Sequence, residues 1–221
     1  MKVNRKHSWS LNYHEAKNLQ EKLASEVVTH DIFGTVKKVG GVDIAFRGKT
    51  ACAAVVVMSF PGMELLDFAV SYTCIPYPYI PGLLSFREIP CIVSSVQKLG
   101  TEPDLLLVDG HGLAHPRKFG LASHLGFLTE VPAIGCAKSR LVGDYVHPGP
   151  KKGEWEPLTH TGEVVGAVVR TRDEVKPVFV SIGYGVCLKS AVWFVLQCAV
   201  RYRLPEPVRY AHRAAKQGRL D

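Results

Sequence analysis

Residues 104–124 read DLLLVDGHGLAHPRKFGLASH, and this stretch sets the expectation for both the fold and the site. It begins with a short aliphatic run, Leu105 to Val108, of the length and composition typical of a β-strand buried on both faces. A sheet with such a strand is covered by helices on both sides, which indicates an α/β fold. Asp109 follows at the carboxyl end of the strand, among glycines, histidines and basic residues. This pattern predicts an anion-binding loop beside an acidic group that binds metal.

The segments before this stretch predict helices and an antiparallel meander. An amphipathic helix is expected at residues 14–28, and a second helix at residues 86–99. Between them lie three β-rich runs, separated by Gly48-Lys49 and Pro61-Gly62, at residues 36–46, 51–60 and 64–74.

The segments after it alternate between strands and helices. Helices are expected at residues 121–128, 186–202 and 206–218, and strands at residues 133–136, 162–170 and 177–181. The polar segment 143–160, which contains proline and glycine, predicts a mobile excursion. We therefore expect a single domain over residues 1–221, with a ribonuclease H-like α/β fold. Its mixed sheet should have three antiparallel first strands and flanking helices.

Composition narrows the class of protein. The chain has 221 residues, 47% of them hydrophobic, and a formal charge of +7, which favours a polyanionic partner although soluble proteins of other kinds share such a balance. Its six cysteines form no CxxC pair and no short-loop framework, so a secreted disulfide scaffold is excluded. The N-terminus lacks a signal-peptide apolar core, and residues 191–200 are too few to cross a bilayer. We expect a cytoplasmic monomer without a membrane partner.

Asp43 stands in the apolar strand Gly41-Val42-Asp43-Ile44-Ala45-Phe46. Strand alternation places it on one face between the small residues Gly41 and Ala45. A buried acid is costly unless it is paired or binds a cation, so a metal ligand and an ion pair with lysine or arginine both remain open.

Glu88 is the third candidate acid, after Asp43 and Asp109. Ser85-Phe86-Arg87-Glu88 also has the spacing of a helix capping box, an alternative that Pro90 weakens. Three converging carboxylates would repel one another unless a divalent cation, Mg²⁺ or Mn²⁺, neutralised them. A zinc site would instead use His111, His115 and His124 as ligands. Their spacing is not a standard zinc signature, and the basic residues Arg117 and Lys118 lie next to them in the sequence.

The segment Pro76-Tyr77-Pro78-Tyr79-Ile80-Pro81-Gly82 alternates prolines with aromatic residues, which stiffens its backbone. A stiff arm can present a tyrosine as a wedge between stacked bases, and a displaced base then needs a pocket. Backbone groups near the acids, at Gly82, Leu84 and Gly110, could line it. Alternatively, the tyrosines simply cover the core.

Together these motifs resemble the endonuclease V family of deoxyinosine-directed nucleases. The similarity is carried by GVDIAF at 41–46, PYIPGLLSFRE at 78–88, VDGHGLAHPRKFGLASHLG at 108–126, IGCAKSRL at 134–141 and RLPEPVRYAH at 203–212. The resemblance implies a ribonuclease H-like fold and a role in DNA repair. It also implies Mg²⁺-dependent hydrolysis, with Mn²⁺ as a substitute, of the second phosphodiester bond 3′ to hypoxanthine, leaving a 3′-hydroxyl and a 5′-phosphate. The implied partner is DNA containing deoxyinosine, and inosine-containing RNA is a further expected substrate.

Roles are carried over motif by motif. The resemblance implies metal binding by Asp43, Glu88 and Asp109, and places Lys138 and His212 near the scissile phosphate and the metal-bound water. For the substrate it implies a wedge at Tyr79 within Pro78, Ile80 and Pro81, a base pocket at Gly82, Leu84, Gly110 and Leu121, and positioning groups at Arg87 and His115. On residues alone, Lys138 and His212 would be surface side chains. The chain departs from the family's VSPGHR at residues 180–185, which read VSIGYG and so lack a histidine and an arginine. This puts in doubt a backbone contact and the substrate preference, but not the acids.

Two other functions stay open. A ribonuclease H-like nuclease could select a nucleic-acid structure rather than a base, and a catalytically silent module could bind nucleic acid without cutting it.

Overall fold

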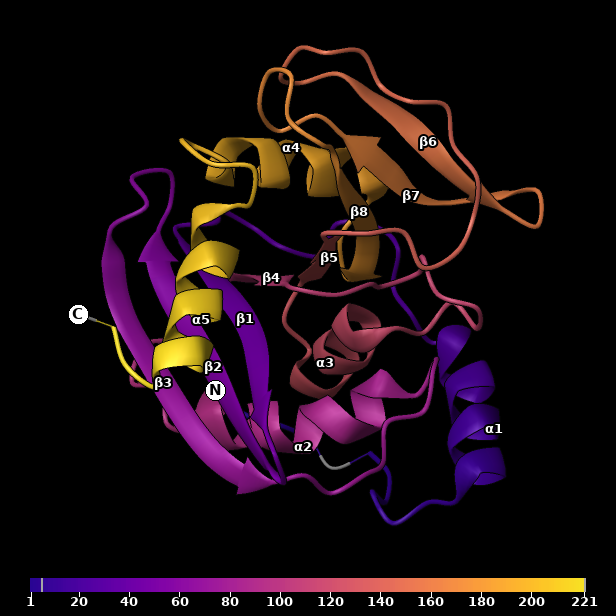
Figure 1. The fold of residues 1–221 in the computed structure, drawn as a ribbon, viewed down its shortest axis with the longest axis vertical. Coiled ribbons are helices and arrows are strands. Elements are labelled where there is room, and N and C mark those ends of the chain that lie inside the picture. The colour runs from indigo at the N-terminus through magenta and orange to yellow at the C-terminus, as the bar shows by residue number, and fades with distance from the viewer. Residues whose placement is uncertain (5, 221) are drawn as a thin grey trace.

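A computed structural model describes residues 1–4 and 6–220, and an eight-stranded mixed sheet forms its centre (Figure 1). Across the sheet the order is β3-β2-β1-β4-β5-β8-β7-β6. Only the pairs β1–β4 and β4–β5 are parallel. The strands are β1 (Lys38–Arg47), β2 (Thr50–Ser59), β3 (Leu65–Cys74), β4 (Leu105–Val108), β5 (Ala133–Ala137), β6 (Trp155–His160), β7 (Glu163–Val169) and β8 (Val178–Tyr184). The predicted mixed sheet with three antiparallel first strands is confirmed.

Helices cover both faces of the sheet. One face packs against α2 (Leu84–Val96) and α3 (Leu121–Thr129), and the other against α4 (Leu188–Cys198) and α5 (Glu206–Gln217). Figure 1 shows α1 (Tyr13–Ala24) beside α2 and α3 rather than on the sheet. In the described part of the chain, no helix combines the length and apolar character needed to span a membrane.

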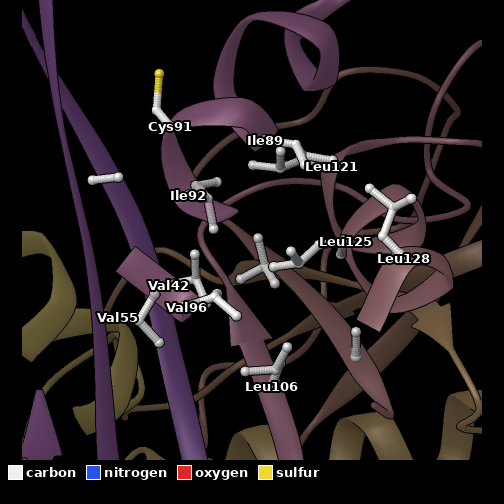
Figure 2. Packing of buried hydrophobic residues seen from close by; sticks show 14 of the residues in the cluster. Val42, Val55, Ile89, Cys91, Ile92, Val96, Leu106, Leu121, Leu125 and Leu128 are labelled. Carbon is white, nitrogen blue, oxygen red and sulfur yellow. The ribbon is translucent and has the colours of Figure 1, made fainter. Parts of the chain in front are cut away.

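Residues of β4 alternate between the two cores. Leu106 and Val108 face α2 and α3, in the cluster that Figure 2 shows, whereas Leu105 and Leu107 pack with residues of α4 and β8. All four side chains are fully buried. The strand is therefore buried on both faces, as its unbroken aliphatic run predicts.

Two predicted elements need correction. The segment 143–160 is not a mobile excursion throughout, because Trp155–His160 forms β6, and Asp144 bridges to Thr159. Pro157 obscures this strand in the sequence, but β6 is an edge strand, where a missing ladder donor is tolerated. The helix predicted at 186–202 ends at Cys198, since Ala199 leaves helical geometry and its carbonyl accepts a hydrogen bond from Lys152.

The end of β4 creates the space for a site. Val42 on β1 pairs with Val108, the last residue of β4, and the backbone N–H of Asp109 donates to the Val42 carbonyl at 3.0 Å. Beyond this point β1 continues without β4 beside it. Near this point α5 packs on β1 so closely that a Cβ at Gly41 would lie 1.9 Å from the Pro207 carbonyl oxygen. Glycine at position 41 therefore brings α5 over the strand that carries Asp43.

Candidate metal site and adjoining pocket

Two predicted acids and a histidine meet where β4 ends. Asp43 comes from β1, Asp109 follows β4, and His212 comes from α5. One ligand atom from each lies within 4.8 Å of the others. The Asp43 and Asp109 side chains are only 10% and 12% exposed. Among the described residues, this is the group with a geometry that could hold a metal ion.

Asp43 is held by an imidazole and a backbone N–H rather than by a lysine or arginine. Its Oδ2 lies 2.6 Å from Nδ1 of His212, and its Oδ1 accepts a hydrogen bond from the Ile44 backbone N–H at 2.8 Å. Burial raises the pKa of Asp43, and the nearby Asp109 carboxylate raises it further, whereas His212 opposes the shift. The ion pair with a basic side chain occurs instead at Asp109, whose Oδ2 contacts Nζ of Lys138.

Glu88 belongs to the same charged group and does not cap its helix. α2 begins at Leu84 after Leu83, no side chain caps its amino end, and the Ser85 hydroxyl bonds to His124 instead. The capping-box alternative is therefore wrong. Burial raises the pKa of Glu88 to about 8, with the Asp43 and Asp109 carboxylates as the next causes. The charges of Asp43 and Asp109 therefore act on Glu88, although Glu88 is not one of the three residues whose ligand atoms lie within 4.8 Å of one another.

The donor set fits a hard divalent cation. It offers carboxylate oxygens and one imidazole nitrogen. Burial first, and then repulsion between neighbouring carboxylates, raises the pKa of Asp43 in this set and of Glu88 near it. A bound cation would stabilise the charged form of both acids.

The zinc alternative has no support in the geometry. The three histidines point to separate partners: His111 to the Ser139 carbonyl, His115 to the Gly82 carbonyl and His124 to the Ser85 hydroxyl. Their ring nitrogens do not converge, and none of them joins the metal-capable group found among the described residues.

Lys138 is positioned by a residue that the sequence reasoning missed. Lys138 follows β5, and its backbone carbonyl accepts a hydrogen bond from Nη2 of Arg203 at 2.7 Å. The same Nη2 donates to the Pro177 carbonyl at 2.8 Å. Arg203 is the first residue of the motif RLPEPVRYAH, which ends at His212. Its presence in a motif that carries a predicted site residue was the sequence signal for its role.

A pocket of about 150 Å³ lies next to the acids. A cavity of this size admits a single aromatic ring. Its lining includes most of the predicted substrate residues: Tyr79, Ile80, Pro81, Gly82, Leu84, Gly110, His115 and Leu121. It also includes residues that were not predicted to line the base pocket: Gln20, Ser85, His111, Gly120 and Leu141. The lining does not include Pro78 or Arg87, which border a separate surface hollow.

The two tyrosines of the proline-rich segment differ in environment. Tyr77 is 8% exposed and packs with Phe86, so for this residue the alternative of covering the core is correct. Tyr79 is 68% exposed at the rim of the pocket. Arg87 donates to the Tyr77 carbonyl at 3.2 Å and stacks on Phe46, so it fixes the base of the segment.

The other end of the segment is clamped at Gly82, whose φ of +78° suits glycine. The Gly82 carbonyl accepts hydrogen bonds from Nη2 of Arg117 at 2.6 Å and Nε2 of His115 at 3.0 Å. Nε of Arg117 in turn donates to Oε1 of the buried Gln20 at 2.7 Å. Gln20 was missed, although a polar residue between Ala16 and Leu23 on the buried face of α1 is a visible signal.

The segment that departs from the family pattern supports the loop after Asp109. The Ser181 hydroxyl accepts a hydrogen bond from the Gly112 N–H at 2.9 Å, and the Ile182 carbonyl accepts one from the Leu113 N–H at 2.8 Å. Both contacts involve residues of β8. These two residues of the segment therefore support the loop, although the histidine and the arginine of the family pattern are absent at positions 184 and 185.

Comparison with known proteins gives a consistent result. The profile of the family described as Endonuclease V matches residues 21–213. An Endonuclease V of Roseiflexus sp. is 50% identical over 212 residues, covering 96% of each chain. The solved structure of Endonuclease V from Streptomyces avermitilis has a TM-score of 0.91 at 36% identity, covering 99% of this chain and 97% of that one.

A further solved structure, Endonuclease V of Ciona intestinalis, is in complex with DNA that contains an inosine followed by a ribo-adenosine. It has a TM-score of 0.82 at 30% identity and covers 93% of this chain and 95% of that one. The expected ribonuclease H-like fold is confirmed by these structural matches.

Proposed function

Because the chain belongs to the endonuclease V family, we propose that it recognises deoxyinosine in DNA and hydrolyses the second phosphodiester bond 3′ to it. The products are a 3′-hydroxyl and a 5′-phosphate, and the reaction depends on Mg²⁺, for which Mn²⁺ substitutes. The observation that carries the proposal is the gathering of Asp43, Asp109 and His212, with a buried Glu88 on which the charges of both aspartates act. The chain supplies this reaction in DNA repair.

Asp43, Glu88 and Asp109 would hold the cation, with His212 beside them. A divalent cation in this position activates water and stabilises the charge that develops on phosphate oxygens. The chain's own residues prepare the site: His212 orients the Asp43 carboxylate, and the Ile44 N–H fixes its other oxygen.

Lys138 supplies positive charge for the phosphate backbone. Its side chain is 38% exposed, and its ammonium group pairs with Asp109. The ammonium group would also contact a phosphate oxygen of the substrate, and a cation held by Asp109 would add positive charge beside it. Arg203 keeps the Lys138 backbone in place.

The pocket beside the acids receives the flipped base. Tyr79 projects from the clamped segment at the rim and fills the gap that the base leaves in the stack. Gly82, Leu84, Gly110 and Leu121 line the pocket closely, so that main-chain groups meet the edge of the base. The inosine-containing DNA bound by the Ciona relative supports this substrate class, and inosine-containing RNA is a second expected substrate.

The test uses a labelled strand with one deoxyinosine, incubated with Mg²⁺ and mapped at nucleotide resolution. We expect one cut, at the second phosphodiester bond 3′ to the lesion, and none in the matched strand with deoxyadenosine. Equal cutting of both strands would favour a structure-selective nuclease. Binding without cutting in Mg²⁺ or Mn²⁺ would favour a silent binding module.

A further inference from the structure

A directed chain of hydrogen bonds runs from the N-terminal segment to the pocket. Nδ1 of His7 lies 2.8 Å from the Ser8 carbonyl oxygen, and Nε2 of His7 lies 2.7 Å from Nε2 of His124. Nδ1 of His124 lies 3.1 Å from the Ser85 hydroxyl. Ser85 lines the pocket, whereas His124 is fully buried behind it.

The partners fix the direction of every bond in this chain. A carbonyl oxygen only accepts, so Nδ1 of His7 carries the proton and donates to Ser8. Nε2 of neutral His7 must then accept, and Nε2 of His124 donates to it. This leaves Nδ1 of His124 as an acceptor, and the Ser85 hydroxyl donates its single proton to that atom. Burial lowers the pKa of His7 and of His124, which favours the neutral imidazoles that this order of donors and acceptors requires.

The Ser85 oxygen is consequently left with lone pairs alone. A hydroxyl usually rotates and can donate or accept, but this one has its proton committed to His124. The Gly82 carbonyl, which also lies in the pocket lining, is not free to accept a hydrogen bond from a bound base. It already accepts two hydrogen bonds, its full capacity.

We propose that Ser85 is a specificity-determining residue whose hydroxyl oxygen accepts the N1–H proton of hypoxanthine, and that His124 and His7 are positioning residues that keep it an acceptor. Hypoxanthine carries a proton on N1, whereas adenine has a lone pair there. An oxygen that cannot donate therefore favours hypoxanthine and repels adenine at the same position. This inference rests on the proposed function and adds to it a side chain that recognises the N1–H group of the base.

The first experiment compares Ser85→Ala with the unmodified protein on two strands. One carries deoxyinosine, and the other carries purine deoxyriboside, whose N1 has no proton. The ratio of the two kcat/KM values does not depend on the folded fraction. We expect Ser85→Ala to lower this ratio about five- to tenfold, the equivalent of one hydrogen bond. An unchanged ratio would overturn the role of Ser85.

Ser95→Ala is the matched control. Ser95 is also a buried serine of α2, and its hydroxyl donates to the Ala53 carbonyl at 2.8 Å, away from the pocket. Its loss should lower the melting temperature but leave the kcat/KM ratio unchanged. A ratio that falls equally in both variants would show a general loss of packing and would contradict the proposal.

The second experiment determines the donor and acceptor of each hydrogen bond from His7 to Ser85, and it does not depend on catalysis. Imidazole ¹⁵N chemical shifts of the full-length protein should show the proton on Nδ1 of His7 and on Nε2 of His124. A proton on Nδ1 of His124 would make Ser85 a donor to the pocket and would overturn the proposal. If the protein cuts no inosine strand at all, the proposed function fails, but this measurement still decides the tautomers.

The third experiment tests whether His7 and Ser85 act through the same series of hydrogen bonds. His7→Phe removes the acceptor for His124 and should lower the kcat/KM ratio about threefold. In the Ser85→Ala background the same substitution should have no further effect, because the two residues act through one path. Additive losses would overturn the positioning role of His7.

Discussion

At the scale of single residues, the negative charges of the candidate metal site are not fully balanced by neighbouring cations. Glu88 is 6% exposed and feels the charges of two aspartates, while Lys138 pairs with Asp109 and His212 pairs with Asp43. Protonation is then the way to remove the surplus charge in the metal-free protein. The pKa of Glu88, raised to about 8, expresses this competition between a proton and a metal ion.

Glu88 should make the metal-free protein less stable as the pH rises. Its pKa lies near 4.5 in an unfolded chain and near 8 in the folded protein. A raised folded pKa gives stability that is complete below about pH 4.5 and is lost as the pH rises through about 8. Relative to Glu88→Gln, the free energy of unfolding should fall by up to ~1.4 kcal/mol for each pH unit in this window. Chemical denaturation in chelator, at a series of pH values, measures the difference.

Glu64→Gln, at an exposed position, serves as the control and should follow the unmodified protein. Saturating Mg²⁺ should reduce the difference between Glu88→Gln and the unmodified protein at high pH, since the cation replaces the proton. A pH dependence that is identical in Glu88→Gln and the unmodified protein, without metal, would argue against a shared acidic group.

Asp43→Ala should abolish cleavage and leave DNA binding largely intact. The substitution removes a metal ligand, whereas the basic side chains that meet the phosphates remain, so we expect at least a thousandfold loss of rate, on the order of 4 kcal/mol. Cleavage in Mg²⁺ and binding in chelator are measured on the same deoxyinosine strand. Asp144→Ala, at a side chain that is 99% exposed, is the control and should cleave normally. If Asp43→Ala fails to fold, the residue serves as a structural partner of His212.

The residues differ in how far sequence could predict them. Asp43 and Asp109 are visible because an acid interrupts or ends an apolar strand, whereas their partners Lys138 and His212 were expected only from the family resemblance. Gln20, Ser85 and Arg203 were missed because their roles depend on contacts made between distant segments, such as Ser85 with His124. Such contacts exist only once helices from different parts of the chain pack together.

At the scale of elements, the segment from Pro76 to Gly82 is a preorganised arm. Arg87 fixes the carbonyl of Tyr77 at one end, and Arg117 and His115 fix the carbonyl of Gly82 at the other. Between them Tyr79 remains exposed. An arm held at both ends loses little conformational entropy when it enters a base stack.

Tyr79→Ala should impair cleavage of duplex substrates more than of single strands. Only a duplex has to be opened, and the lost stacking is worth about 1–3 kcal/mol. We expect roughly a tenfold or greater loss of kcat/KM on a duplex containing deoxyinosine, and a clearly smaller loss on the same strand alone. Tyr13→Ala, at an exposed tyrosine of α1, should change neither value. Equal losses on both substrates would remove the wedge role.

Elements with regular patterns were predictable, whereas irregular ones were not. The aliphatic run of β4 predicted a strand buried on both faces, and the structure confirms this. β6 was missed because Pro157 breaks its alternation, and the end of α4 was misplaced because an apolar pattern continues past Ala199. In both cases the deciding factor is a tertiary contact, the pairing with β7 and the bond from Lys152.

At the scale of the whole molecule, the sheet order places the site. β1 lies beside β4 although β2, β3 and α2 separate them in the sequence. This adjacency brings Asp43 next to Asp109, and α5 returns from the end of the chain to add His212. The resemblance to a family supplied this topology in advance, since residue patterns predict strands more readily than their neighbours.

The net charge of +7 should make binding depend on salt in a way that is independent of the base. Lysines and arginines that contact phosphates release counterions, so the logarithm of the binding constant falls linearly with the logarithm of salt concentration. The pocket that would hold the base is mainly apolar and main-chain, so we expect the same slope for strands with deoxyinosine and with deoxyadenosine. Their binding curves should differ by a constant factor only. Titrations in chelator at several salt concentrations measure both slopes, and Lys138→Ala should reduce each by about one phosphate contact. A steeper slope for deoxyinosine alone would mean that base recognition recruits further charged contacts, and would contradict a pocket that reads the base through neutral groups.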